Sequence, residues 1–284
     1  MSKILACTDG SVYALSTYDH AAWAAQRMGA SVDVLHVLDH HREAPVVSDL
    51  SGNLGFDASA ELMQQIADVE AAKGKLAIEK AKVILADAKK RFTEDGIENV
   101  NVIQRHGSLV ATVEEYEKGA DLVVIGKRGE AADFDTLHLG ANLERVIRSS
   151  KIPVLVAARK FEPVEKFLIA YDGGPSAEKA VDFVVSNPLL RGLECHLLMV
   201  GRDKPSADAK SAAARERLSG AGFKVTAEII EGDADEVIAR EVKQRGIDLL
   251  VMGAYGHSKI RQLFVGSTTT AMVRTCCVPV LMFR

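Results

Sequence analysis

The sequence predicts an α/β protein built from two tandem, open parallel sheets with helices on both faces. Two observations carry this prediction. The chain of 284 residues contains one internal repeat, and within each copy short apolar segments alternate with segments of helix-like apolar spacing. Length and composition agree, because a chain of this size gives about two ordinary domains. A hydrophobic content of 48% and a charged content of 26% are typical of folded globular proteins.

The repeat sets the domain organisation. Segment 3–38 aligns without a gap on segment 166–201, so that Asp9 matches Asp172 and Gly10 matches Gly173. Further along, "GADLVVIGKRG" at 119–129 matches "GIDLLVMGAYG" at 246–256. We therefore predict a first domain over residues 1–160 and a second over residues 161–284, joined near "RKFEPVEK".

Each copy begins with an apolar run that ends in Asp, "KILACTD" and "KFLIAYD", which predicts a first strand. A helix follows over 11–30 in the first copy and stops at Gly29. "SVDVLHVL" and "ECHLLMV" predict second strands. "ADLVVIG" and "IDLLVMG" are continuous apolar runs, as expected of strands covered on both faces. "IPVLVA" and "VPVLMF" carry proline near the strand start, where a missing amide is tolerated. This pattern gives four strands per copy.

The two copies differ most in the middle. Residues 58–92 of the first copy are rich in Ala, Glu, Lys and Leu, which predicts a long amphipathic helix after a loop at 40–57. The second copy has a shorter predicted helix at 206–222. The long apolar helix face can either cover its own sheet, which is the commoner use, or serve as a dimer surface.

Charge, hydropathy and cysteine usage exclude several classes of protein. A net charge of −4 argues against a general nucleic-acid-binding protein. No apolar run approaches the ~20 residues of a membrane span, and the first residues lead directly into a strand without a leader pattern. The cysteines lack metal-site spacing and are expected to be reduced thiols. We therefore expect a cytoplasmic protein with no nucleic-acid, membrane or metal partner. The cysteines are Cys7, Cys195, Cys276 and Cys277.

The segment "GAYGHSKIRQLFVGST" at 253–268 is the strongest functional signal. Ligands of open parallel sheets bind beyond the carboxyl ends of the strands. Glycines there let an anion approach backbone amides, and a following helix N-terminus favours negative charge. The segment therefore suits a phosphate-bearing ligand, although tight turns with a Ser/Thr helix cap would explain the same residues. It is neither a P-loop nor a dinucleotide fingerprint. Its key residues are Gly253, Gly256, His257, Lys259, Arg261, Gly266, Ser267 and Thr268.

The spacing Gly-x2-Gly-x9-Gly-Ser-Thr resembles that of ATP-binding members of the universal stress protein family. The tandem repeat, the Asp that ends the first strand and the closing strand are also similar, so the resemblance covers nearly the whole chain. It implies two tandem Rossmann-like (adenine-nucleotide alpha-hydrolase-like) domains of five strands each. It also implies that the domains pair within the chain through their last strands. ATP, with or without Mg²⁺, would lie across the carboxyl edge of the second sheet.

The resemblance also implies a set of binding residues. Asp172 would face the adenosine, the backbone around Val200 would meet the adenine, and the glycines and hydroxyls would hold ribose and phosphates. An Asp before Gly at a strand end also has a simpler interpretation, since it commonly forms a turn or caps the next helix. The implied residues are Ala170, Asp172, Gly173, Val200, Gly253, Gly256, His257, Gly266, Ser267 and Thr268.

The first copy departs from this pattern. In "GKRGEAADFDTLHLGAN" at 126–142, ten residues separate the last two motif glycines instead of nine, and Ala141–Asn142 replace the hydroxyl pair. Three acids stand where the second copy has His257, Lys259 and Arg261, and they would repel a triphosphate. The hypothesis is that the second copy binds ATP and that the first is degenerate. The acids are Glu130, Asp133 and Asp135.

The leading function is therefore a nucleotide-binding stress-response sensor or regulator. No nucleophile–base pair is visible near the loop, so no catalytic residue is predicted and at most slow ATP hydrolysis is expected. The alternative is an interaction or scaffold protein whose nucleotide sites are vestigial. A nucleotidyl-transferring enzyme of related fold is disfavoured, because no His-x-x-His or Ser-Gly-Gly motif follows the first strand. The sequence leaves open whether two such chains form a homodimer.

Overall fold

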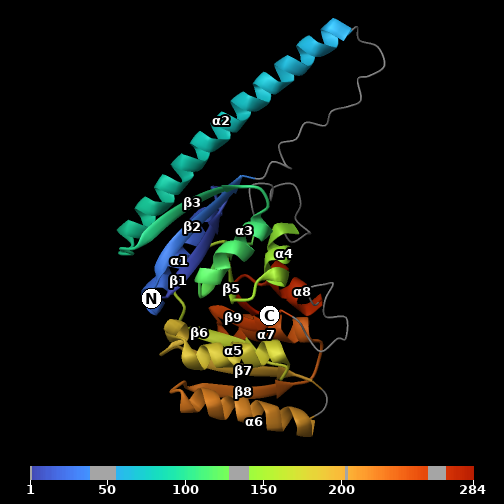
Figure 1. The fold of residues 1–284 in the computed structure, drawn as a ribbon. Coiled ribbons are helices and arrows are strands. Elements are labelled where there is room, and N and C mark those ends of the chain that lie inside the picture. The colour runs from blue at the N-terminus through green and yellow to red at the C-terminus, as the bar shows by residue number, and fades with distance from the viewer. Residues whose placement is uncertain (1, 39–55, 128–140, 202–203, 255–266) are drawn as a thin grey trace.

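The computed structural model describes residues 2–38, 56–127, 141–201, 204–254 and 267–284. Within these ranges, ten strands form one sheet in the order β3-β2-β1-β4-β5-β10-β9-β6-β7-β8 (Figure 1). All neighbouring strands are parallel except β5 and β10, which pair antiparallel with Leu155 opposite Leu281. Each half is thus a five-stranded parallel sheet, and the halves join edge to edge through their last strands. Both features confirm the expectation.

The elements follow one another in the same order in both halves, apart from short 3-10 turns. The first half contains β1 (Lys3–Thr8), α1 (Ala14–Met28), β2 (Ser31–Leu38), α2 (Phe56–Glu94), β3 (Val100–His106), α3 (Leu109–Tyr116), β4 (Leu122–Gly126), α4 (Ala141–Ser149) and β5 (Val154–Ala157). The second half contains β6 (Lys166–Ala170), α5 (Pro175–Ser186), β7 (Glu194–Val200), α6 (Lys204–Gly220), β8 (Val225–Ile230), α7 (Ala234–Arg245), β9 (Leu249–Gly253), α8 (Ser267–Thr275) and β10 (Val280–Phe283).

Strands β3 and β8, with the helices α3 and α7 that follow them, correct the four-strand pattern predicted from apolar runs. These two strands lie at the outer edges of the sheet. Along β3 only Ile103 is buried, and every residue of β8 is half-buried. An edge strand with so little burial needs no continuous apolar run, so the pattern missed it. The segment that begins at Gly253 therefore follows the fourth strand of its half and not the third.

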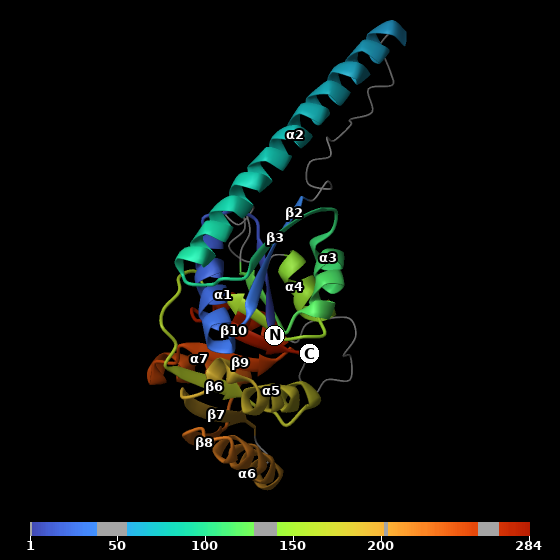
Figure 2. The ribbon, with the colours of Figure 1, turned by 60° about the vertical axis from the view of Figure 1, so that its left-hand side comes forward.

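The sheet is covered on both faces. Alternate strand residues point to opposite faces, so Ile4 and Ala6 pack in one hydrophobic layer while Leu5 and Cys7 pack in the other. Helices α1, α2, α5 and α6 cover the first face, and α3, α4, α7 and α8 cover the second (Figures 1 and 2). The carboxyl ends of the parallel strands are left for loops.

Helix ends follow the sequence closely. Gly29 ends α1 with a φ of 58°, the left-handed region that glycine adopts without strain. Helix α2 spans 56–94 against a prediction of 58–92, and α6 spans 204–220 against 206–222. The loop predicted at 40–57 lies mostly outside the described residues. Among the helices of the described chain, none is long and apolar enough to cross a membrane.

The two halves also cap each other's last helix. Lys127, just after β4, donates a hydrogen bond from Nζ to the carbonyl oxygen of Cys276 at the end of α8. Arg284, just after β10, donates from Nη1 to the carbonyl oxygen of Ser149 at the end of α4, at 3.0 Å. Cations at helix C-termini are favoured by the helix dipole. The join between the halves therefore combines a strand pair with two reciprocal helix caps.

Candidate functional site

A cavity of about 160 Å³ lies at the carboxyl edge of the second sheet. It is formed where β6 lies between β7 and β9, the point at which strand order reverses and at which open α/β sheets bind ligands. The ends of β6, β7 and β9 supply its floor, and the first turns of α7 and α8 supply its sides. Its lining residues are Ala170, Tyr171, Asp172, Leu198, Val200, Ala234, Ile238, Met252, Gly253, Thr268 and Thr269.

Half of the residues named from the sequence lie in this lining. The structure brings together Ala170, Asp172, Val200, Gly253 and Thr268. Gly173 follows Asp172 in the turn but is not a lining residue of the cavity. Ser267 is the first residue of α8, although its side chain lies outside the described set. The remaining three, Gly256, His257 and Gly266, lie outside the described residues.

The turn after β6 is held by its own aspartate. Asp172 accepts a hydrogen bond at Oδ1 from the backbone N–H of Gly174, at 2.8 Å, and Gly173 has a φ of 67°. The first half repeats this geometry, since Asp9 Oδ1 accepts from the backbone N–H of Ser11 at 3.0 Å. The turn-forming interpretation of these aspartates is therefore realised in both halves. What Asp172 adds is that it also lines a cavity.

Gly253 has a packing reason to be glycine. A Cβ at this position would lie 2.9 Å from Cβ of Ser176 and 3.4 Å from the backbone nitrogen of Ala177, at the start of α5. The end of β9 therefore approaches α5 too closely for any side chain. This glycine is explained by the fold whether or not a ligand is present, so it adds little to the functional argument.

Thr269 fixes the start of α8 and was missed by the sequence argument. It is 3% exposed, and its hydroxyl lies within hydrogen-bonding distance of the carbonyl oxygens of Gly253 (3.3 Å) and Ala254 (3.2 Å). This contact ties the first turn of α8 to the end of β9 and so sets where Thr268 stands. The run "STTT" at 267–270 was the available signal. In the first half, Leu143 takes the matching position and is also 3% exposed.

A lysine from α6 covers the turn after β6. A Cβ on Gly173 would lie 2.5 Å from Cδ and 3.1 Å from Nζ of Lys210, so the lysine side chain passes directly over this turn. In the first half the corresponding space over Gly10 is filled by Ile84 of α2. The second half thus places a positive charge beside its aspartate turn, and the first half places a methyl-bearing side chain there.

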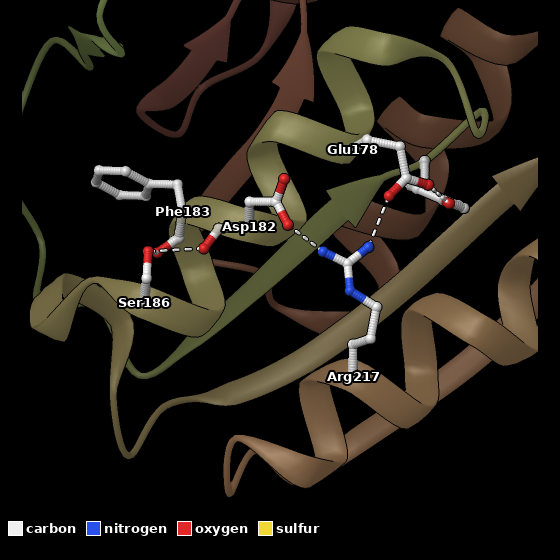
Figure 3. A network of polar contacts seen from close by, with 6 residues as sticks. Glu178, Asp182, Phe183, Ser186 and Arg217 are labelled. Atoms are coloured by element: carbon white, nitrogen blue, oxygen red, sulfur yellow. Dashed lines mark hydrogen bonds and ion pairs between the residues drawn. The ribbon is translucent and has the colours of Figure 1, made fainter.

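Helix α6, which carries Lys210, is joined to α5 by an ion-pair network (Figure 3). Arg217 donates to Oε2 of Glu178 at 2.6 Å and also to the carboxylate of Asp182. Arg217 follows Lys210 by seven residues, which puts both on one face of α6. The same Glu178 accepts a hydrogen bond from the hydroxyl of Tyr171 in the cavity lining. Burial, this hydrogen bond and the Glu178 charge all raise the pKa of Tyr171, which stays protonated at neutral pH.

The cavity suits an aromatic group with a polar edge. Most of its lining is aliphatic, and its polar lining residues are Asp172, Tyr171 and the two threonines at the start of α8. Sites for small organic ligands have this mixture of an apolar wall and a few placed polar groups. A cavity of about 150 Å³ is known to admit an aromatic ring, while whole ligand pockets are about 300–1,000 Å³. The described cavity therefore has room for a base and not for a whole nucleotide.

Metal coordination has no support in the described part of the chain, where no group of three or more His, Cys, Asp or Glu side chains could hold an ion. The thiols are likewise unpaired there: Cys7, Cys195 and Cys276 are buried and Cys277 is exposed. Burial raises the pKa of Cys7 and of Cys195 to about 12, so both are inert thiols at neutral pH.

Comparison with known proteins places the chain in a family. The model of the Universal stress protein family matches residues 1–158 and 202–284. Universal stress protein Slr1230 of Synechocystis sp. is 43% identical over 100% of both chains. A universal stress protein of Mycolicibacterium smegmatis is 23% identical and covers 99% of this chain and 96% of its own.

A solved structure supports the same fold. The crystal structure of a universal stress protein from Archaeoglobus fulgidus superposes with a TM-score of 0.71 at 21% identity, covering 99% of this chain and 96% of that chain. The tandem architecture is therefore shared over the full length. By the family match and the full-length relative, this chain belongs to the universal stress protein family.

Proposed function

We propose that this universal stress protein binds an adenine nucleotide, ATP with or without Mg²⁺, in the cavity of its second half, and acts as a stress-response sensor or regulator. One observation carries the proposal. Five residues named from the sequence, on β6, β7, β9 and α8 or directly after them, line a single cavity at the strand-order reversal. The strand-order reversal at the carboxyl edge is the usual position of a ligand site in open α/β sheets, and these residues line a cavity at that position.

The shape of the cavity suggests how the nucleotide is oriented. The base occupies the apolar space beside Val200 and Met252, and the ribose lies toward the carboxylate of Asp172. The phosphates extend out of the cavity toward the N-terminus of α8, where free backbone amides and the helix dipole favour negative charge. Lys210, over the neighbouring turn, adds a cation at the same carboxyl edge, although α6 lies on the other face of the sheet from the cavity.

The first half offers a poorer site for a nucleotide. In the first half, Lys127 occupies the position that corresponds to Ala254. Its Nζ donates a hydrogen bond to the carbonyl oxygen of Cys276 in the other half. Leu143 replaces the threonine hydroxyl, and Ile84 replaces the lysine over the turn. These substitutions, with the acids of 130–135, favour one nucleotide per chain.

A matched pair of substitutions tests the proposal. Val200 at the end of β7 and Val37 in β2 are equivalent, half-buried positions. Val200→Trp fills the cavity and should lower the affinity for labelled ATP, measured by equilibrium titration, by at least about tenfold, whereas Val37→Trp should leave it unchanged. Equal losses in both variants, or no loss in Val200→Trp, would overturn the assignment. Substituting Gly256 and, separately, Gly129 gives a second comparison, with loss expected only for Gly256.

The second candidate function is an interaction or scaffold protein with vestigial sites. It is favoured by the loss of polar groups from the first half. Heat release of small molecules from the pure protein, followed by mass spectrometry, separates the two. Co-purified or titratable nucleotide supports binding, and the absence of both supports the scaffold.

Slow ATP hydrolysis is a third outcome. Among the described lining residues Asp172 is the one carboxylate, and its Oδ1 already accepts a turn hydrogen bond. It is therefore poorly arranged to activate water, and we expect little turnover. The cytoplasmic location and the boundaries 1–160 and 161–284 stay predictions.

A further inference from the structure

Helix α2 is much longer than the sheet it covers. Its 39 residues give a length of about 58 Å, whereas the longest strand has eight residues, about 26 Å. The helix residues buried against the sheet lie in its last part and include Ala81, Leu85, Ala88 and Phe92. The first part runs on past the edge of the domain, as Figures 1 and 2 both show.

The projecting part and its continuation carry a regular row of apolar side chains. Leu62, Val69, Leu76 and Val83 recur every seven residues. A seven-residue step falls about 20° short of two helical turns, so the four lie along one face of α2. Val69 is 53% exposed, Leu76 71% and Val83 69%. Single exposed apolar residues are ordinary on protein surfaces, but an apolar row that repeats every seven residues along one helix supplies one of the two apolar positions of the heptad by which helices pair.

The charges on α2 are divided between its two ends. Residues 56–72 contain four acidic residues and no lysine or arginine, and residues 73–94 contain seven basic and three acidic residues. The first part therefore has a net charge of −4 and the second of +4. Two such helices repel each other when parallel and attract each other when antiparallel.

We propose that α2 pairs antiparallel with α2 of a second copy of this chain. In this arrangement Leu62 of one copy packs against Val83 of the other, and Val69 packs against Leu76. Each acidic part lies along the basic part of the partner. Glu70 of one helix then lies on the same side of the helix pair as Lys73 of the other, so that opposite charges favour this register.

The chain supplies its own control for the apolar row. Met63 is 61% exposed on the same helix but lies about 100° around it from Leu62, outside the row. Val69→Gln with Leu76→Gln should raise the dimer dissociation constant by about tenfold or more, measured by sedimentation equilibrium of the full chain. Met63→Gln should leave it unchanged. A full-length protein that stays monomeric up to about 100 µM, well above ordinary dimer dissociation constants, overturns the proposal, and so does a dimer insensitive to the double substitution.

Disulfide trapping tests the direction of pairing. In a Cys277→Ser background, Leu62→Cys combined with Val83→Cys should form crosslinked dimers, whereas Val83→Cys alone should not. Crosslinking by Val83→Cys alone indicates parallel helices and overturns the proposal. The charge contact has its own test, because Glu70→Lys and Lys73→Glu should each weaken the dimer and their combination should restore it.

The dimer and the nucleotide site are independent. Val69 and Leu76 are exposed and lie in the first half, so the double glutamine variant should fold normally by circular dichroism. It should also bind ATP as the unsubstituted chain does. Failure of nucleotide binding would therefore leave this proposal standing, and failure of dimerisation would leave the proposed function standing.

Discussion

After β1 the chain turns at Asp9–Gly10, and after β6 it turns at Asp172–Gly173, with the same aspartate-to-amide hydrogen bond in each turn. Around these equal turns the chemistry differs. Ile84 covers the first turn and Lys210 covers the second. The comparison teaches that the backbone of a ligand site can persist as part of a fold while the side chains that would use it are lost.

The same comparison applies to the helices that follow the turns. His20 on α1 corresponds to Phe183 on α5 in the repeat, and His20 is 1% exposed. Its Nδ1 donates to the carbonyl oxygen of Ser16 at 2.6 Å, and its ring packs edge-on against Phe161. Nε2 is buried and has no hydrogen-bond partner among the described residues. The first half thus carries a titratable group where the second carries a phenyl ring.

The largest expected effect concerns this difference. Burial lowers the pKa of His20 to about 4, while an unfolded histidine titrates near 6.5. Because the unfolded state binds the proton first, the neutral histidine stabilises the fold fully above about pH 6.5. This stabilisation is lost as the pH falls toward 4, by about 3 kcal/mol. His20→Phe should abolish the part of the acid-induced loss of unfolding free energy that comes from His20.

Denaturant unfolding at pH 7 and at pH 4.5 measures the effect. The informative quantity is the loss of unfolding free energy between the two pH values, compared between the two proteins, because other carboxylates titrate in both. An equal loss in the variant and the unsubstituted chain would show that His20 is not the acid-sensitive group.

The second prediction compares the two aspartates. Asn keeps the oxygen that accepts the turn hydrogen bond, so Asp172→Asn and Asp9→Asn should both fold normally. A hydrogen bond to a charged group contributes about 1.5–3 kcal/mol, so Asp172→Asn should lower the affinity for ATP at least about tenfold. Asp9→Asn should leave ATP affinity unchanged. Similar affinities for both variants in the same titration would mean that Asp172 serves the turn alone.

The smallest expected effect concerns the cation over the turn. Lys210 is exposed, so its attraction for a phosphate is screened by water and salt. Lys210→Gln should lower the affinity for ATP by only a few-fold. The difference in affinity between the variant and the unsubstituted chain should shrink as ionic strength rises. Exchanging Lys243, an exposed lysine in the last turn of α7 away from the cavity, for Gln gives a control of equal charge. If both variants lose affinity equally, the effect is one of net charge and Lys210 has no specific place in the site.

Much of the architecture was accessible from the sequence because buried parallel strands leave a clear trace. "LLVM" and "VLMF" are unbroken apolar runs, and the repeat showed that each strand had a counterpart. The edge strands β3 and β8 left no such trace, since only one of β3's seven residues is buried. The helices α3 and α7 were not predicted either, because each follows one of the strands that the pattern missed.

The site was predicted as far as local motifs reach. Asp172 and Gly253 were found because they end apolar runs. Leu198 could have been inferred, since it lies two residues before Val200 and so faces the same side of β7. Ala234 and Ile238 could not, because their helix was not predicted. Lys210 is brought to the turn only by the packing of α6 on α5, which no local pattern encodes.

Because β5 and β10 pair within one chain, their contact does not weaken when the protein is diluted. When two separate chains meet through their last strands, the contact weakens as concentration falls. Here the eight residues between Ala157 and Lys166 tether the partners, so their effective concentration is set by the linker and stays constant. In a dimer of two identical chains, a substitution in one subunit always appears in the other as well. Halves joined in one chain can accumulate different substitutions, and each position in one half always meets the same position in the other.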